Sequence, residues 1–329
     1  MGWVLNHRLL YRIELTDMKM YRMTQMPLLD SRVHQRILEK KKRLDALRPL
    51  PSSIVRKIEQ QMEIEYIYNS NAIEGNTLKL RETQLVLEEG ITIEGKSLRE
   101  HLEARNHPKA IRYVEKITGR SLKEQDIFVL HQIIMKGIAE DAGRFRATEA
   151  RISGADFMPP PAYEVPHLIT ELIDWYNRNP DELRPIELAA ILHHRLVHIH
   201  PFRDGNGRIA RLLMNLTLMR NRYPIAVILN VDRKKYYDVL KNADAGDPTA
   251  LTNFVAAAVE RSLDLYLRAL YPTEKDDKLL TLAEASKTSP YSQEYLSLLA
   301  RKRRIAAVKI GRKWMISKKA LQEYLKELQ

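Results

Sequence analysis

Twelve residues near the middle of the chain constrain its local structure more than any other segment. Residues 200–211 read HPFRDGNGRIAR, and an apolar stretch, IARLLMNLTLMR, begins within them. Two glycines beside Asp and Asn predict a loop, and the apolar stretch predicts a helix that starts where the loop ends. The first N–H groups of a helix lack partners inside the helix and lie at the positive end of its dipole. The segment therefore predicts a binding site for an anion such as phosphate.

The side chains around this loop can hold a phosphate from several directions. Gly205 and Gly207 carry no Cβ, so the backbone can approach an anion closely there. Arg208 and Arg211 lie three residues apart on one helical face, where their planar forks can bind further phosphate oxygens.

Two more residues supply groups for a reaction at phosphorus. Asp204 offers a hard oxygen ligand for Mg²⁺ beside the phosphates. His200 stands just before the loop, and the ordinary pKa of histidine, about 6.5, makes it a good general base at neutral pH. An anion site, a metal carboxylate, two arginines and a base together indicate attack on a nucleotide phosphate.

The loop also has other interpretations. Asp204 or Asn206, each taken alone, can be a helix cap. The pattern Gly205-x-Gly207-x-x-Ala210 formally fits a dinucleotide-binding fingerprint, but that fingerprint follows a buried strand. Here the polar residues HIHPFRD precede it and follow a helical pattern. No GxxxxGK[ST] loop occurs, which excludes a P-loop protein.

A group of histidines precedes the loop. His194 and His198 are four residues apart, with His193 and His200 beside them, and such spacing occurs in metal sites. No carboxylate joins them in a HExxH pattern. The sequence therefore favours packing and hydrogen-bonding histidines over metal ligands.

The segment resembles the signature of the Fic family, HPFx[D/E]GNGRxxR, and every fixed position is present. The motifs GRFR and PPP upstream and IELAAILHHRLVHI just before the signature also resemble this family, over roughly residues 30–235. The resemblance implies a mainly α-helical fold with a short β-hairpin flap. It also implies transfer of AMP from ATP to a Ser, Thr or Tyr hydroxyl of a protein, with release of pyrophosphate.

The resemblance assigns a role to each matching position. His200 would deprotonate the target hydroxyl, and Asp204 would hold Mg²⁺ on the α- and β-phosphates. Arg208 and Arg211 would hold the distal phosphates, and Phe202 would point into the core and fix the loop. The anion hole would be formed by the end of the loop and the start of the helix: Gly205, Asn206 and Gly207.

A flap that aligns the target by strand addition is a further implied feature. The stretch GRFRATEARISGADFMPPPAYEVP contains β-branched residues, glycines and three consecutive prolines, which predict a short hairpin or an extended loop. We place the flap within this stretch, at residues Ile152, Ser153, Gly154, Ala155, Asp156, Phe157 and Met158.

Residues 70–76, SNAIEGN, resemble the inhibitory motif of the family, [S/T]xxxE[G/N], with Ser70 and Glu74 at its fixed positions. In similar proteins the glutamate pairs with the second arginine of the signature, which would be Arg211 here. A carboxylate on the arginine that should bind the γ-phosphate would leave ATP in an unproductive pose. Taken alone, the motif can also be a helix end at which Gly75 is the stop.

The C-terminal part of the chain differs in charge. Residues 273–329 hold 13 Lys and Arg and 7 Asp and Glu, a net charge of +6, which is half of the chain's +12. Their pattern predicts a helix, a turn at 288–290, a second helix that ends in RKRR, and two strands around Gly311. This layout resembles an excisionase-like or winged helix-turn-helix domain, which would bind DNA through its second helix. A small domain for protein interaction or substrate docking is the alternative.

These patterns predict three parts. Residues 1–94 form an N-terminal helical region with the inhibitory motif, residues 95–270 the catalytic core, and residues 273–329 the basic domain. Helices are expected within 31–69, with a break at LRPLP, and within 95–138, 165–178 and 186–199. Cysteine is absent, which excludes disulfides, thiolate metal sites and thiol nucleophiles.

We therefore expect a cytoplasmic, Mg²⁺-dependent protein adenylyltransferase that is inhibited by its own Glu74. Its expected partners are ATP, a protein with a target hydroxyl, the chain itself, and DNA at the C-terminal domain; no membrane partner is expected. The family resemblance leaves a homodimer open. The alternative function is a DNA-binding regulator whose Fic core senses a nucleotide, transfers a different one, or removes AMP from a target.

Overall fold

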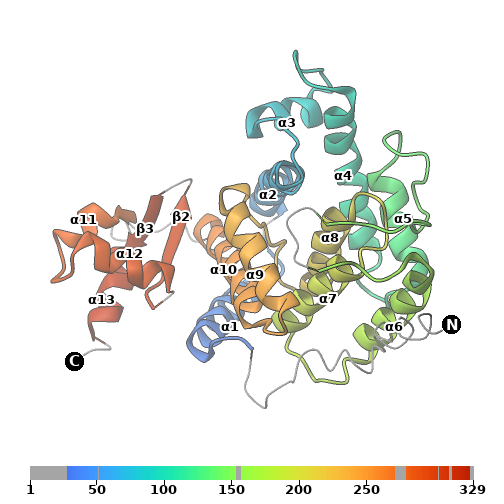
Figure 1. Cartoon of the computed structure of the whole chain (residues 1–329). Helices are drawn as coiled ribbons and strands as arrows, with labels where there is room; N and C mark the ends of the chain where they lie inside the picture. The colour runs from blue at the N-terminus through green and yellow to red at the C-terminus, as the bar shows by residue number, and fades with distance from the viewer. Residues whose placement is uncertain are drawn as a thin grey trace. The chain divides into compact units, whose positions relative to one another are not determined.

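A computed structural model describes residues 28–50, 52–152, 157–270, 279–302, 304–310 and 313–326 of the 329-residue chain. The structure is mainly helical (Figure 1). Its elements divide into two compact units, one formed by residues 1–31 with 61–259 and the other by residues 32–60 with 260–329. Among the described residues, no helix has both the length and the apolarity that a membrane span requires.

The helices follow the sequence patterns closely. The α-helices up to the linker are α1 (Ser31–Ala46), α2 (Ser52–Ile73), α3 (Leu80–Glu88), α4 (Leu98–Lys116), α5 (Glu124–Ile134), α6 (Val165–Arg178), α7 (Pro185–Ile199), α8 (Asn206–Arg220), α9 (Arg233–Asp244) and α10 (Thr249–Leu270), with short 3-10 turns at Ala162–Glu164 and Asn230–Asp232. The expected break at LRPLP separates α1 from α2. The sequence patterns specified no helix at the positions of α3, α9 and α10, although α3 lies in the expected N-terminal helical region.

The core of the first unit is built around α7 and α8, which pack along each other (Figure 1). Helices α4 and α5 lie against α8, while α6 and α9 lie against α7. Twelve of the fifteen residues of α8 are buried, because it is surrounded by other helices. A helix buried on all sides is apolar around its whole circumference, which explains the run IARLLMNLTLM. This burial fixes the loop at the start of α8.

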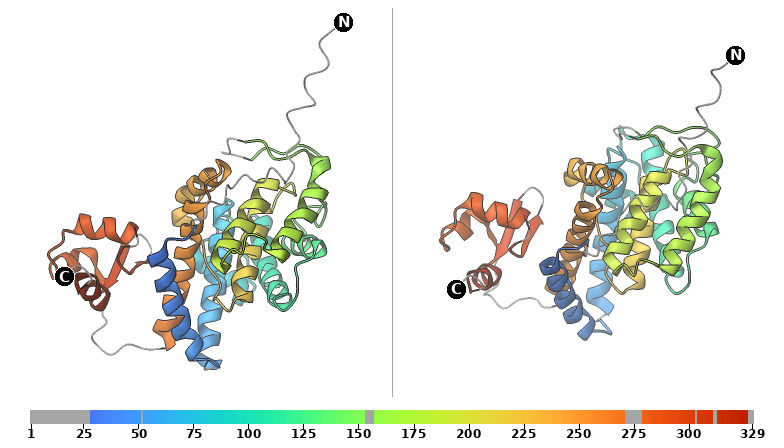
Figure 2. Two further views of the ribbon diagram at one scale, coloured as in Figure 1. Left: turned by 90° about the horizontal axis from the view of Figure 1, so that it is seen from below. Right: turned by 60° about the horizontal axis from the view of Figure 1, so that its bottom comes forward.

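The C-terminal region forms a small helix-and-sheet domain. It contains strands β1 (Leu279–Thr281), β2 (Ala307–Ile310) and β3 (Lys313–Ser317) and helices α11 (Leu282–Ser286), α12 (Gln293–Arg301) and α13 (Lys318–Lys326). The strands pair antiparallel in the order β1-β3-β2, and Figure 2 shows them beside the helices. Its own core consists of nine buried residues: Leu280, Leu282, Ala285, Leu296, Leu299, Ala300, Ile305, Ile316 and Leu321.

Local signals account for most of this domain. Thr281 and Ser292 cap α11 and α12 by accepting backbone hydrogen bonds from the third residue of each helix. The expected helix-turn-helix and the two expected strands are therefore confirmed. The sequence analysis missed β1, which is three residues long and ends at the cap residue itself, and it missed α13.

Part of the expected flap lies outside the described residues, namely Ser153, Gly154, Ala155 and Asp156. Ile152, Phe157 and Met158 are described, and none of them belongs to a strand or a helix. The rings of Phe157 and His198 stack with their centroids 4.2 Å apart. This contact holds one end of the segment against α7.

Candidate active site

Hydrogen bonds fix the backbone conformation of the loop between α7 and α8. Helix α7 ends at Ile199, and its C-cap residue His200 has a φ of +52°, which is uncommon for a residue other than glycine. Asn206, the first residue of α8, accepts a hydrogen bond from Phe202 N–H at 2.9 Å and donates one to Phe202 C=O at 2.8 Å. An asparagine can do both because its amide carries a donor and an acceptor, whereas an ionised aspartate can only accept. Asn206 therefore closes the loop with its side chain.

Phe202 and His131 stabilise the loop by ring stacking and hydrogen bonding. Phe202 is fully buried, and its ring stacks on that of His131 at 3.7 Å between centroids. Gly143 N–H donates to His131 Nδ1 at 2.7 Å, which leaves Nε2 to donate to the carbonyl oxygen of Asp204 at 3.1 Å. Burial lowers the pKa of His131 to about 4, so this ring stays neutral and keeps one donor and one acceptor. The sequence analysis missed His131, which lies on α5 and carries no motif of its own.

Arg146 holds the start of the loop, and the sequence analysis noted it only as part of GRFR. It is buried, and its Nε donates to His200 C=O at 2.8 Å. Its other nitrogens donate to the carbonyl oxygens of Thr148 and Pro160. Its own N–H donates to Pro201 C=O at 2.9 Å. The guanidinium of Arg146 thus links the end of α7 to Thr148 and Pro160, which lie before and after the expected flap.

His200 is oriented to accept a proton. Its Nδ1 lies 3.3 Å from Val197 C=O, which requires that Nδ1 carries the hydrogen and Nε2 the lone pair. Burial lowers the pKa of His200 below its ordinary value, and this outweighs the opposite effect of that hydrogen bond. The ring is therefore neutral at neutral pH, as a general base must be.

Asp204 presents an ionised carboxylate. Burial raises its pKa, but Arg208, the Gly205 N–H and Arg99 together bring it below the ordinary value. The side chain keeps 41% of its exposure. A half-exposed carboxylate oxygen suits a Mg²⁺ ion that completes its shell with waters and substrate phosphates, so the residue fits the metal role that the resemblance implies.

The two arginines of the signature are buried and paired with residues from outside it. Arg208 lies 3.2 Å from Glu103 Oε1 and 3.1 Å from Asp204 Oδ1. Arg211 donates through Nη2 to Glu74 Oε1 at 2.7 Å and to Ser70 C=O at 2.8 Å, and through Nε to Ser70 Oγ at 3.0 Å. A guanidinium buried to this extent needs such partners, because an unpaired buried charge is very costly.

Glu74 also lies against the start of α8. A Cβ placed on Gly207 would collide with Glu74 Oε1 and lie 3.1 Å from Arg211 Nη1. Any other residue at Gly207 would therefore push this carboxylate away. The anionic group of Glu74 lies beside the N-terminus of α8, where an anion is favoured electrostatically.

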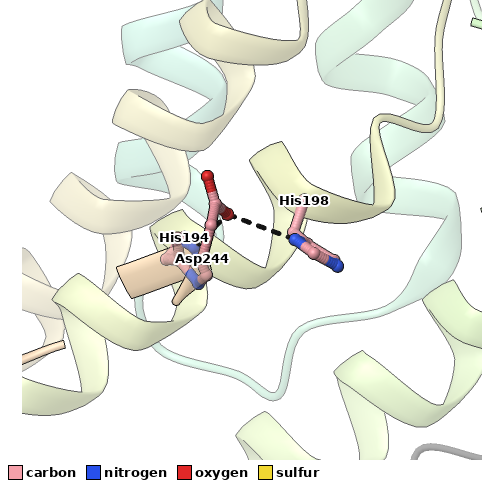
Figure 3. Close-up of side chains that lie close together, drawn as sticks. All are labelled: His194, His198 and Asp244. Atoms are coloured by element: carbon pink, nitrogen blue, oxygen red, sulfur yellow. Dashed lines mark hydrogen bonds and ion pairs between the residues drawn. The ribbon is translucent and has the colours of Figure 1, made fainter. Parts of the chain in front are cut away.

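Three residues that no sequence motif links lie close together beside the C-terminal half of α7. His194 and His198 both contact Asp244, the last residue of α9 (Figure 3). Hydrogen bonds from the two histidines outweigh the effect of burial and lower the pKa of Asp244 to about 2. No short-spacing motif joins a carboxylate to these histidines, because Asp244 follows His198 by 46 residues.

A neutral imidazole, an ionised carboxylate, a helix N-terminus and two buried arginines thus converge on one loop between two core helices. Together with the helical fold, this arrangement is that of a Fic domain, a class defined by its signature loop. Residues 121–218 match the model of the Fic/DOC family, and residues 279–329 match that of a helix-turn-helix domain.

The chain belongs to the Fic/DOC family. It is 38% identical over 252 residues to protein adenylyltransferase Fic from Nematostella vectensis. This alignment covers 74% of this chain and 58% of that protein. It is 35% identical over 277 residues to the protein of the same name from Drosophila mojavensis, with 80% of this chain and 55% of that protein covered. The chain thus spans little more than half the length of these two relatives.

Solved structures agree with this assignment. A Fic domain containing signaling protein from Bacteroides thetaiotaomicron is 31% identical with a TM-score of 0.67, and the match covers 74% of this chain and 99% of that one. Fic-1 from C. elegans is 33% identical with a TM-score of 0.65, and the match covers 72% of each chain.

Proposed function

We propose that this chain is a protein adenylyltransferase, which transfers AMP from ATP to a hydroxyl of a protein, including itself, and that Glu74 inhibits it. The similarity to protein adenylyltransferases supports the reaction. The observation that carries the inhibition is the 2.7 Å ion pair between Glu74 and Arg211 at the start of α8.

In the proposed reaction the phosphates of ATP bind at the N-terminus of α8, with Arg208 and Arg211 on the distal groups. The target hydroxyl gives its proton to Nε2 of His200 as its oxygen forms a bond to the α-phosphorus. The bond between the α-phosphorus and the bridging oxygen breaks, and pyrophosphate leaves. Mg²⁺ held by Asp204, when bound, supplies positive charge to the phosphates.

Inhibition follows from competition between two anions for one cation. Arg211 is fully buried and already holds Glu74 and Ser70. A γ-phosphate cannot form a fork with Arg211 while the carboxylate of Glu74 occupies its Nη2. ATP would then bind with its phosphates displaced, and the α-phosphorus would not lie in line with the incoming hydroxyl. Loss of such alignment removes much of the catalytic advantage of a bound substrate.

The first prediction tests this proposal directly. Glu74→Gly should raise self-labelling with AMP from labelled ATP and Mg²⁺ by at least about tenfold. The reason is that hydrogen bonds to charged groups contribute about 1.5–3 kcal/mol, and about 1.4 kcal/mol changes a rate tenfold. Mass spectrometry of the labelled protein would identify the transferred group and the modified residue.

Glu89→Gln, at the exposed end of α3, is the matched control because it removes a carboxylate away from the loop. Equal incorporation of AMP by Glu74→Gly and the parent protein would contradict inhibition by Glu74. No incorporation of any nucleotide by either protein would contradict the transferase itself and favour a nucleotide-sensing regulator.

We infer a second function, DNA binding, for the C-terminal domain. The match of residues 279–329 to a helix-turn-helix domain supports it. Arg301, Lys302 and Arg304, at the end of α12 and just after it, are exposed, so they can contact phosphates. The competing role is docking of a protein partner.

A further inference from the structure

The group formed by His194, His198 and Asp244 has the geometry of a metal site. His194 and His198 lie one turn apart on α7, and Asp244 ends α9. His194 Nε2 is 2.8 Å and His198 Nδ1 is 3.2 Å from Asp244 Oδ1. All three ligand atoms lie within 4.8 Å of one another (Figure 3). Ligands of a tetrahedral Zn²⁺ ion, at bonds of about 2.0–2.1 Å, stand about 3.3 Å apart, so changes of up to about 1.5 Å in the distances between ligand atoms would admit an ion.

The types of ligand select the kind of ion. Two imidazole nitrogens and one carboxylate oxygen suit Zn²⁺, Co²⁺ and Ni²⁺, whereas Mg²⁺ and Ca²⁺ prefer oxygen ligands alone. Three protein ligands leave a coordination position for water, as in many zinc sites. The group is thus chemically distinct from Asp204, the residue expected to hold Mg²⁺.

The charge around Asp244 favours a cation. Asp244 is the last residue of α9, where the helix dipole is negative and an acidic side chain is unfavourable. Among the residues that the structure describes, Asp244 forms no ion pair with a lysine or an arginine; its partners are the two histidines. Burial lowers the pKa of His194, so its imidazole supplies a hydrogen bond without a full positive charge. A divalent ion would supply that charge.

Access and rigidity also fit. The side chain of His194 is 1% exposed, while those of His198 and Asp244 are 19% and 18% exposed, so an ion can reach the group from solvent. Both histidines lie on a core helix, and Phe157 stacks on the ring of His198 and limits its rotation. Ligands held by rigid elements need little reordering when an ion binds.

We propose that His194, His198 and Asp244 bind one divalent transition-metal ion, with Zn²⁺ as the reference ion, and that this ion fastens α9 to α7. When the metal binds, the hydrogen on each ligating nitrogen is given up to solvent and the other nitrogen of the same ring takes up a proton, so each imidazole stays neutral and Asp244 stays ionised. This inference does not rest on the proposed transferase activity.

The test uses the full-length protein without an affinity tag, because tag histidines bind the same ions. The protein is stripped with a chelator and dialysed, and Zn²⁺ binding is measured by isothermal titration calorimetry. Co²⁺ is then added as a spectroscopic probe of histidine ligation. We expect one ion per chain and a higher melting temperature with Zn²⁺ than without it, since binding to the folded state alone raises stability.

Variants identify the ligands. Asp244→Asn and His198→Gln should each weaken Zn²⁺ binding by at least about tenfold and remove the rise in melting temperature. Asp244→Asn preserves shape, so it remains informative if a change at buried His194 prevents folding. His167→Gln is the matched control, because His167 is an exposed histidine that pairs with the carboxylate of Glu171 one turn away on α6. Absence of Zn²⁺ binding by the stripped parent, or binding that Asp244→Asn and His198→Gln leave unchanged, would overturn the proposal.

Discussion

At the scale of residues, the charged groups of the signature loop are each paired with a residue from outside it. Glu74 and Ser70 hold Arg211, and Glu103 holds Arg208. Such pairs satisfy buried charges that would otherwise be costly. In the proposed reaction, the phosphates of ATP would have to replace these protein anions on the arginines. The uncharged His200 is different, because its contacts set its tautomer and leave Nε2 to accept a proton.

The second prediction concerns this base. His200→Ala should lower transfer of AMP by about 10²–10⁴-fold, which is the usual contribution of a general base. Binding of ATP should stay within a few-fold of the parent, because the residue makes no anion-binding contact in the proposed reaction. The measurement is AMP incorporation and nucleotide affinity in the Glu74→Gly background. Transfer that persists in this variant would remove His200 from the role of base.

At the scale of elements, α4 delivers two charged residues to the loop. Arg99 and Glu103 lie one turn apart, and they contact Asp204 and Arg208 respectively. Arg99 forms an ion pair with the carboxylate of Asp204, which the proposed reaction needs as a ligand for Mg²⁺. The pair is about half exposed, so water screens it, and exposed ion pairs contribute at most about 1 kcal/mol.

The third prediction follows from this competition. Arg99→Ala, in the Glu74→Gly background, should lower the Mg²⁺ concentration that gives half-maximal transfer by about two- to fivefold, the equivalent of up to about 1 kcal/mol. Arg112→Ala is the matched control, because Arg112 lies on the same helix and forms a similarly exposed pair with Glu63. A Mg²⁺ requirement that is unchanged or higher in Arg99→Ala would show that Arg99 does not compete with the ion.

At the scale of the whole molecule, the chain has two compact units, and the C-terminal domain within the second has a core of its own. Helices α2 and α10 each contribute residues to both units. The division into parts at residues 94 and 270, expected from the sequence, stays a prediction. Self-association of the chain also stays a prediction. A domain with its own core can carry a separate function such as DNA binding.

The fourth prediction tests that function in the full-length protein. Arg301→Ala with Arg304→Ala should weaken binding to duplex DNA and reduce the dependence of the binding constant on salt by about two phosphate contacts. Fluorescence anisotropy at several salt concentrations measures both. Lys109→Ala with Lys136→Ala, which removes the same charge from exposed positions elsewhere, is the control. Failure of the parent protein to bind DNA at low salt would exclude this function.

The sequence by itself determined the features that depend on neighbouring residues. Helices α1, α2 and α4 to α8, the break between α1 and α2, the loop that opens α8 and the helix-turn-helix followed by two strands were predicted, and the fold class is confirmed. The meeting of Glu74 with Arg211, which are 137 residues apart, was expected from the family resemblance and not from any local pattern.

Only the tertiary structure decided which distant residues complete these local features. Arg99 reaches Asp204 across 105 residues, and Asp244 reaches His198 across 46. His131 supports the loop from a segment without a motif, and Arg146 supports it from GRFR, to which no role had been assigned. The physical reason is that a periodic pattern fixes which face of a helix is buried, while the packing of one helix on another fixes which side chains meet there.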